Sequence, residues 1–340
     1  MINKHNVQSK KGNWLTVLIL MVVGSLVLSG CGAQAAPKVY HVGILNGFPP
    51  FADITAGFKA EMTELGYIEG ENIIYDVQIA NFDPVEEQRI LEQFVADEVD
   101  LIFAFATEAA LTAKAATQGT DIPVVFAHAG LEGNDLVESV RQPGGNVTGT
   151  RFPGPGNTVK RFEFLLEIVP QAKRVYVTYN ENYPVNQASL EALRPAASSL
   201  GITLVEDPLT GVEEIQANLQ ARAASDDIGM DAILIMPDDL FQSPVGWPLI
   251  TAFAAEHNVP IGGAAPFTAD TGALFSYVPD FFEVGQLAAP LADKVLKGTP
   301  AGTIPVSTPE DRLRLNYKQA QELGLMVPES LLSRATEIMR

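Results

Sequence analysis

The sequence has few of the residues from which disulfide bonds, metal sites and nucleic-acid surfaces are built. Its single cysteine, Cys31, excludes a disulfide bond within the chain and a metal site with several thiolates. The four histidines are scattered, with no pair at metal-ligand spacing; they are His5, His41, His128 and His257. Lysine and arginine number 22 against 41 acidic residues, a net charge of −19. This balance argues against nucleic acid, because binding phosphate requires clustered basic residues.

Common catalytic and cofactor motifs are also missing. No G-x-S-x-G turn of a serine hydrolase is present, and no G-x-G-x-x-G follows the first predicted strand. Residues 154–160 (Gly-Pro-Gly-Asn-Thr-Val-Lys) fail the spacing of a phosphate-binding loop and contain a stiff proline. We therefore expect no cofactor, no metal and no enzymatic activity. An exported α/β enzyme that uses Asp238 or His128 is the less favoured alternative.

The N-terminal residues have the pattern of a secretory signal, predicted over residues 1–30. Lysines precede an apolar run at residues 15–28, which as a helix would extend about 21 Å, less than the ~30 Å hydrocarbon core of a membrane. The run ends in Leu-Ser-Gly-Cys at 28–31, which resembles a bacterial lipobox, so we expect cleavage before Cys31 and lipid attachment to it. An ordinary signal peptide and an uncleaved anchor helix are the alternatives. Residues 31–38 are predicted to be a tether to the folded body.

After this region, strand-like and helix-like patterns alternate. Strands are predicted at residues 39–45, 73–79, 101–106, 122–127, 174–179, 202–205, 232–236, 259–261 and 273–277. Several are apolar on both faces, which is typical of parallel sheets that helices cover on both sides. The fold class is therefore α/β, with two doubly wound parallel-sheet lobes and a hinge. The stretch at 143–156, rich in Gly and Pro, is interpreted as the linker between them.

The predicted lobes are discontinuous in sequence. The N-terminal lobe comprises residues 39–150 plus about 279–302, and the C-terminal lobe residues 151–278 plus about 303–340. Open α/β sheets bind ligands beyond the carboxyl ends of their strands. Two such sheets that face each other therefore predict a cleft between the lobes as the binding site.

Several segments match a known family in order and spacing. They include residues 65–73 (LGYIEGENI), 122–126 (IPVVF), 142–149 (QPGGNVTG) and 272–277 (GALFSY). Together they resemble the bacterial substrate-binding lipoproteins of ABC transporters with the type I periplasmic-binding fold, several of which bind aromatic amino acids. The resemblance runs over nearly all of residues 39–340.

This resemblance implies a two-lobed, extracytoplasmic receptor that closes on a small molecule without changing it. The implied solute is an amino acid, with aromatic ones among the family's ligands. The implied partners are an ABC permease with its ATPase and the membrane, which the protein contacts through a lipid anchor at Cys31; we expect a monomer. A solute-sensing lipoprotein that presents its ligand to a signalling partner is the alternative.

The sequence departs from the family at two predicted strand ends. Residues 128–131 (His-Ala-Gly-Leu) replace the usual Asp-Pro-Val, and residues 180–184 lack the common Asn-Pro followed by a small polar pair. Because both positions face the predicted cleft, the ligand of the family cannot simply be transferred to this chain.

Candidate ligand-binding residues follow the predicted strands. They are Asn46, Phe48, Thr107, Glu108, His128, Asn180, Tyr183, Asp238, Asp239 and Tyr277. Thr107 is predicted to cap the next helix, whose N-terminus could hold a carboxylate; the alternative is a plain cap. Asp238 or Asp239 would pair with an ammonium group, or else cap a helix that faces water.

The aromatic candidates also have two interpretations each. Phe48 would form a stacking wall of the cleft or pack in the core. Tyr183 and Tyr277 would cover a planar or apolar solute, with a structural role at the hinge as the alternative for Tyr277. His128 follows the fourth strand and is either a ligand contact or a structurally satisfied side chain.

Overall fold

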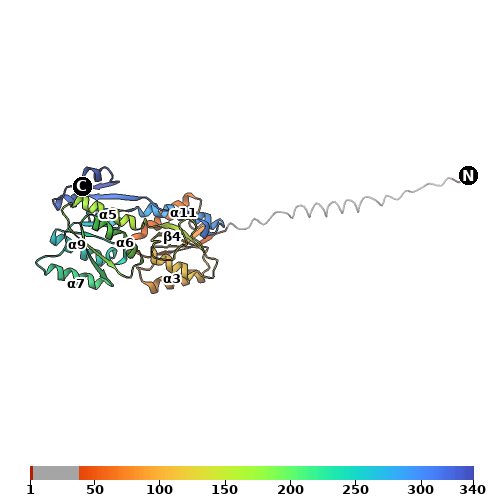
Figure 1. Cartoon of the computed structure of the whole chain (residues 1–340). Coiled ribbons are helices and arrows are strands. Elements are labelled where there is room, and N and C mark those ends of the chain that lie inside the picture. The colour runs from red at the N-terminus through yellow and green to blue at the C-terminus, as the bar shows by residue number, and fades with distance from the viewer. Residues whose placement is uncertain (3–37) are drawn as a thin grey trace. The chain divides into compact units, whose positions relative to one another are not determined.

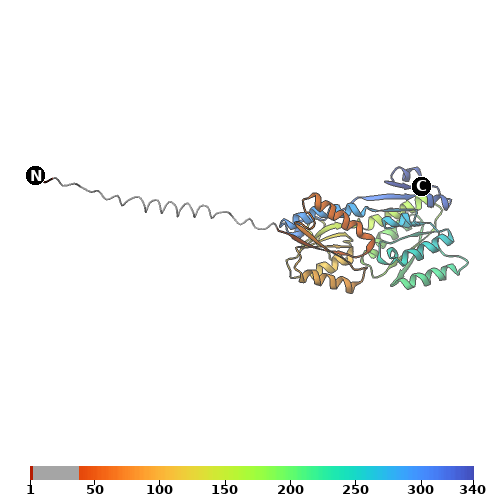
Figure 2. The same ribbon diagram turned by 180° about the vertical axis from the view of Figure 1, so that it is seen from behind.

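The computed structural model describes residues 1–2 and 38–340. The predicted signal peptide, apart from its first two residues, and Cys31 lie outside the described residues. Residues 39–340 form one unit, which contains two α/β lobes with one sheet each (Figures 1 and 2). Among the described residues, no helix is both long and apolar enough to cross a membrane.

The first lobe is built on a five-stranded, fully parallel sheet of order β2-β1-β3-β4-β5. Its strands are β1 (Tyr40–Asn46), β2 (Ile73–Ile79), β3 (Leu101–Phe105), β4 (Val124–Ala129) and β5 (Val147–Arg151). Its helices are η1 (Pro49–Phe51), α2 (Ala52–Glu64), α3 (Pro84–Ala96), α4 (Thr107–Ala116), α11 (Phe281–Leu296) and η2 (Ala301–Thr303). All residues of β3 are buried, as expected for a central strand with helices on both faces.

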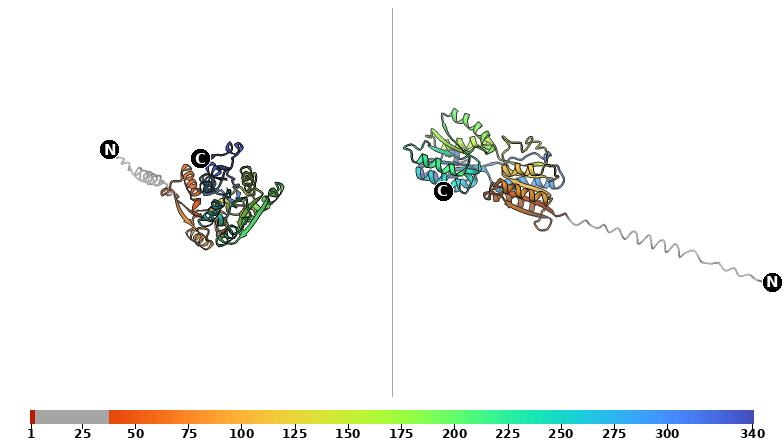
Figure 3. Two further views of the ribbon diagram at one scale, coloured as in Figure 1. Left: turned by 90° about the vertical axis from the view of Figure 1, so that its left-hand side faces the viewer. Right: turned by 90° about the horizontal axis from the view of Figure 1, so that it is seen from below.

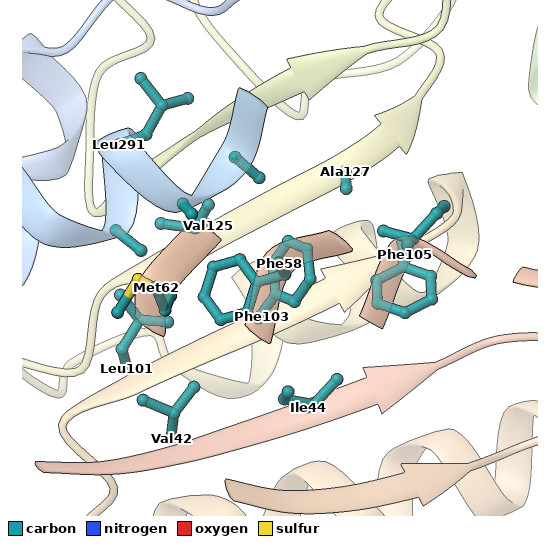
Figure 4. Packing of buried hydrophobic residues seen from close by; sticks show 14 of the residues in the cluster. Val42, Ile44, Phe58, Met62, Leu101, Phe103, Phe105, Val125, Ala127 and Leu291 are labelled. Atoms are coloured by element: carbon teal, nitrogen blue, oxygen red, sulfur yellow. The ribbon is translucent and has the colours of Figure 1, made fainter. Parts of the chain in front are cut away.

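Helices α2 and α11, far apart in sequence, cover one face of this sheet together. Phe58 of α2 stacks on Phe103 of β3 with ring centroids 4.1 Å apart (Figure 4). A Cβ atom on Gly57 would lie 1.9 Å from the carbonyl oxygen of Phe282, so this glycine permits the close approach of the two helices. On the other face, Phe94 of α3 belongs to a second buried cluster.

The second lobe contains a seven-stranded sheet of order β12-β11-β10-β9-β8-β6-β7, parallel except for the β10–β11 pair. Its strands are β6 (Arg174–Asn180), β7 (Thr203–Leu209), β8 (Ala232–Leu234), β9 (Ile261–Gly263), β10 (Phe275–Pro279), β11 (Asp311–Asn316) and β12 (Glu337–Met339). Its helices are α5 (Pro155–Ile168), α6 (Pro184–Ser199), α7 (Val212–Ala223), α8 (Asp239–Gln242), α9 (Gly246–His257), α10 (Pro266–Asp270), α12 (Tyr317–Glu322) and α13 (Glu329–Leu332). In Figure 3 this lobe, green and cyan, lies beside the orange and yellow first lobe. The C-terminal segment completes the second sheet through β11 and β12.

The chain passes between the lobes three times. The first passage follows β5, the second lies at Asp280 between β10 and α11, and the third precedes β11. Ser307 still pairs with the first lobe, because its N–H donates to Gly149 and its carbonyl accepts from Arg151, both at 2.9 Å. The third passage therefore comes after Ser307, a few residues later than the predicted boundary near 303.

The two-lobed α/β fold class is confirmed, and β2 has the predicted bounds. The interpretation of residues 143–156 as a linker is wrong, because this stretch contains β5. Gly149 of β5 lies against β4, and a Cβ atom there would be 2.1 Å from the Phe126 carbonyl oxygen. This glycine is thus required by close strand packing, not by flexibility.

Candidate functional site

A cavity lies between the two lobes, beyond the carboxyl ends of strands from both sheets. The lobes lie so close together in this structure that its free volume is about 20 Å³, room for about one water molecule, so a larger solute would enter only when the lobes move apart. Its first-lobe lining is Phe51, Phe82, Ala106, Thr107, His128 and Gly130, followed by Phe152 at the first passage between lobes. Its second-lobe lining is Tyr183, Val185, Pro237 and Asp238.

Aromatic rings form most of the apolar wall. The His128 ring lies 5.6 Å from that of Phe51 and 5.3 Å from that of Phe152, between ring centroids. Phe51 is also edge-on to Phe82, at 6.3 Å. Such walls suit a planar or apolar group, and the faces of phenyl rings also attract cations.

His128 is held in an uncommon backbone conformation. Its φ of 51° lies in the left-handed region, where β4 shifts register between Phe126 and Ala129. Burial lowers the pKa of His128 to about 4, so the ring is neutral at physiological pH. Its Nδ1 atom is buried without a hydrogen-bond partner. A neutral imidazole whose buried nitrogen lacks a partner is well placed to contact a ligand.

Glu108, the second residue of α4, carries the most unusual polar group of the site. Both of its carboxyl oxygens are buried without a hydrogen bond of ordinary geometry, although its own N–H and the Tyr183 hydroxyl lie close to them. Burial, together with the smaller effect of the charges of Asp239 and Glu87, raises the pKa of Glu108 to about 8. Asp239 belongs to the second lobe, so the Glu108 carboxyl is influenced by the charge of an acid from the other side of the cleft. We call Glu108 and Asp239 the acidic pair.

The predicted role of Thr107 as a helix cap is corrected by the structure. The cap of α4 is Ala106, and Thr107 is the first residue of the helix. The Thr107 hydroxyl accepts a hydrogen bond from the Gly130 N–H at 3.0 Å, which ties the start of α4 to the end of β4. The hydroxyl is thus partly used within the first lobe.

Asp238 is largely committed to the structure of the second lobe. Its carboxylate accepts hydrogen bonds from the Asn180 N–H (2.9 Å), the Asn186 side chain (2.9 Å) and the Phe241 N–H (3.2 Å), and thereby caps α8. Burial raises the pKa of Asp238 to about 7. The Asn180 side chain donates in turn to Asp239 at 2.8 Å. Asn180 therefore positions both aspartates without lining the cavity itself.

Tyr183 brings a hydroxyl from the second lobe to the acidic pair. Burial raises its pKa well above the usual value, and the charges of Glu108 and Asp239 act in the same direction. The hydroxyl therefore stays protonated and can donate a hydrogen bond.

Four of the ten predicted site residues line the cavity, namely Thr107, His128, Tyr183 and Asp238. Besides Glu108, Asn180 and Asp239, which lie next to lining residues or bond to them, three more lie outside the cavity wall. Phe48 is buried and stacks behind Phe82 at 5.0 Å between ring centroids. Asn46 is buried and accepts a hydrogen bond from the Phe48 N–H at 2.9 Å. Tyr277 packs edge-on to Phe164 in the second-lobe core, 5.0 Å away. Each supports its own lobe and does not face the cavity.

The sequence interpretation missed the phenylalanines that do face the cavity. Phe51 follows a Pro-Pro turn, and Phe82 has a positive φ of 56° after Asn81, which is also left-handed. Phe152 follows the unpredicted strand β5. The available signal was local, an aromatic residue directly after a strand and its turn; it predicted Phe48 and Tyr183 but not these three phenylalanines.

A family model described as "ABC transporter substrate binding protein" matches residues 44–339. The chain belongs to this family. A relative from Clostridioides difficile (strain R20291) named "Tyrosine-binding protein" is 31% identical over 318 residues, which cover 89% of this chain and 88% of the relative.

Solved structures of similar proteins include both a loaded and an empty one. A Streptococcus protein in complex with L-Trp has a TM-score of 0.80 at 25% identity, covering 89% of this substrate-binding protein and 100% of the other chain. A ligand-free, open substrate-binding protein from Clostridium difficile has a TM-score of 0.66 at 26% identity, with 88% and 99% coverage. This substrate-binding protein thus superposes better on the loaded relative than on the open one.

Proposed function

We propose that this substrate-binding protein is an extracytoplasmic receptor that binds an amino acid with an aromatic side chain between its lobes and delivers it to an ABC permease with its ATPase. The observation that carries the proposal is the cavity between the lobes, lined by aromatic rings and by Thr107, whose neighbour in sequence, Glu108, has buried carboxyl oxygens. A ligand ammonium group would satisfy that carboxyl with a charge-assisted hydrogen bond. The names of two relatives, one binding tyrosine and one in complex with L-Trp, support the same solute class.

Because the residues that line the cavity come from both lobes, we expect the lobes to close on the solute. A solute that touches Glu108 and His128 in an open cleft gains contacts with Tyr183 and Asp239 only when the lobes approach. This difference in binding free energy shifts the equilibrium toward the closed form, which the permease distinguishes from the open one.

The lipid anchor is a separate part of the proposal. The Leu-Ser-Gly-Cys sequence at 28–31 supports cleavage before Cys31 and acylation of its thiol and new amine. Two or more acyl chains hold a protein stably on a membrane. Incorporation of labelled palmitate into the wild type, and its loss in Cys31→Ala, would test this part.

Isothermal titration calorimetry of the purified protein with the twenty amino acids tests the solute class. We expect saturable binding of at least one of phenylalanine, tyrosine and tryptophan, and a higher unfolding temperature in its presence. Binding of no amino acid, at concentrations up to about 1 mM, would contradict the proposal.

A further inference from the structure

The ionisable groups around the cavity are mostly acids. None of the residues that line it within 38–340 is lysine or arginine, and its histidine is neutral. The carboxyl groups of Asp238 and the acidic pair lie on it or beside it. An amino acid has both an ammonium and a carboxylate group. The acidic side chains can pair with the ammonium group, but no cationic side chain in the lining can pair with the carboxylate.

Arg151 and Arg161, which precede and follow the lining residue Phe152 in sequence, are already bound to other partners. Arg151 is paired with Glu132 and donates to the Phe152 carbonyl at 3.1 Å. Arg161 is fully buried and donates to Asn157 (2.9 Å), the Ile235 carbonyl (2.6 Å) and Thr158 (3.1 Å). Neither guanidinium group is free to receive a ligand carboxylate.

The N-terminus of α4 would be the remaining place for an anion, and it has an acid of its own. The Glu108 carboxyl lies by its own backbone N–H, which partly offsets the rise in its pKa. The Thr107 hydroxyl already accepts a hydrogen bond from the Gly130 N–H. A ligand carboxylate here would find the helix end already occupied by the Glu108 carboxyl group.

We propose that the cleft selects its ligand by the ammonium group alone, held between Glu108 and Asp239, so that aromatic amines without a carboxylate bind at least as tightly as the corresponding amino acids. This inference rests on the proposed function and narrows its substrate class to aromatic monocations. The cation favours the ionised form of Glu108, whose proton is released to solvent, and it contacts the aromatic wall. A carboxylate on the ligand adds only a desolvation cost and repulsion from Asp238.

Calorimetric titration with matched ligands tests this inference. The amines are phenethylamine, tyramine and tryptamine, the amino acids are phenylalanine, tyrosine and tryptophan, and 3-phenylpropanoate is the carboxylate without an amine. We expect the best amine to bind as tightly as its amino acid or more tightly, and 3-phenylpropanoate to bind at least about a hundredfold more weakly. An amine that binds over tenfold more weakly than its amino acid would overturn this inference and leave the proposed function standing. Failure of all seven to bind would overturn both.

A matched pair of variants tests the position of the ammonium group. Glu108→Gln keeps the size of the side chain and removes its charge, and we expect it to weaken binding of the best amine at least about tenfold. Glu213→Gln makes the same change at the second residue of α7, where the side chain is exposed, and we expect a change of less than about twofold. Circular dichroism spectra matching the wild type would show that both variants fold. Unchanged amine affinity in folded Glu108→Gln would overturn the inference.

Discussion

The two walls of the cleft use similar side chains in different ways. On the second-lobe side, Asp238 and Asp239 accept hydrogen bonds from Asn180, and Asp238 accepts further ones that cap α8. On the first-lobe side, the oxygens of Glu108 and the Nδ1 atom of His128 are buried without a hydrogen bond of ordinary geometry. The aspartates of the second lobe therefore stabilise that lobe through hydrogen bonds. In the first lobe, the Glu108 carboxyl and the His128 Nδ1 atom are left for a ligand to bind.

The largest expected effect is on the second-lobe side. Asp238→Ala leaves the buried groups of Asn180, Asn186 and Phe241 without their acceptor. We expect the free energy of unfolding, measured by urea denaturation without ligand, to fall by about 3 kcal/mol. Asp226→Ala removes an exposed aspartate of the same lobe and should change stability by less than about 0.5 kcal/mol. Equal stabilities of the two variants would contradict the structural role of Asp238.

The next largest effect is expected on ligand affinity, from a change at Gly130, where the two lobes are in contact. A Cβ atom on this residue would lie 2.4 Å from Cγ2 of Val185 in the second lobe. Gly130→Val should therefore hold the lobes apart and weaken binding of the tightest aromatic ligand by about thirtyfold, or ~2 kcal/mol. Small-angle scattering should also show a larger radius of gyration with ligand present.

The control for this variant is Gly156→Val, because a Cβ atom on Gly156 meets nothing within 4 Å. We expect its ligand affinity and its scattering curve to remain close to those of the wild type. If Gly130→Val closes and binds normally, the lobes do not meet at this point in the loaded state.

A smaller effect is the pH dependence that Glu108 contributes to stability. Its folded pKa is about 8 against an ordinary 4.5, raised by burial and by the facing charges of Asp239 and Glu87, with Tyr183 also close. Between these pH values the folded state keeps a proton that the unfolded state has lost. Stability should therefore fall as pH rises through this window.

Glu108→Gln removes the ionisable group at this position, so the contribution of Glu108 to the pH dependence of stability is lost. The contributions of Asp238 and His128 remain. The stability of this variant relative to the wild type should therefore increase from about pH 5 to pH 8, by on the order of 1 kcal/mol, because water reaches the cleft when the lobes open. Urea denaturation without ligand at several pH values measures the difference. A constant difference would show that Glu108 is solvated in the free protein.

The smallest effect is expected at Tyr277, which lies away from the cavity. Tyr277→Phe keeps the edge-on packing against Phe164. We expect stability within about 0.5 kcal/mol of the wild type and affinity for the best ligand within about twofold. A tenfold loss of affinity would show that Tyr277 reaches the ligand after all.

Much of the fold could be predicted from local patterns. The alternation of apolar strands and amphipathic helices located the elements, and β2 was predicted with its observed bounds. Strand β5 was missed because its glycine is explained only by packing against Phe126 of the neighbouring strand. That contact joins segments far apart in sequence, and no local pattern contains it.

The candidate site was harder to predict, for the same reason. Of the predicted residues after strand ends, Thr107, His128, Tyr183 and Asp238 line the cavity, and Glu108 follows Thr107. Whether such a residue faces the cavity depends on its backbone conformation, as the positive φ of Phe82 shows. It also depends on hydrogen bonds to distant residues, as between Asp238 and Asn186. Phe48 and Phe51 are both aromatic and close in sequence, and only the fold decides that Phe51 lines the cavity.

A crystal structure with the tightest-binding aromatic amine or amino acid would show directly whether the ligand lies between the lobes with its ammonium group at Glu108. The account predicts the ligand between the lobes, with its ammonium nitrogen within about 3 Å of a Glu108 carboxyl oxygen and its ring against Phe51 and His128. A ligand bound outside this cavity, or one whose ammonium group points away from Glu108, would contradict it.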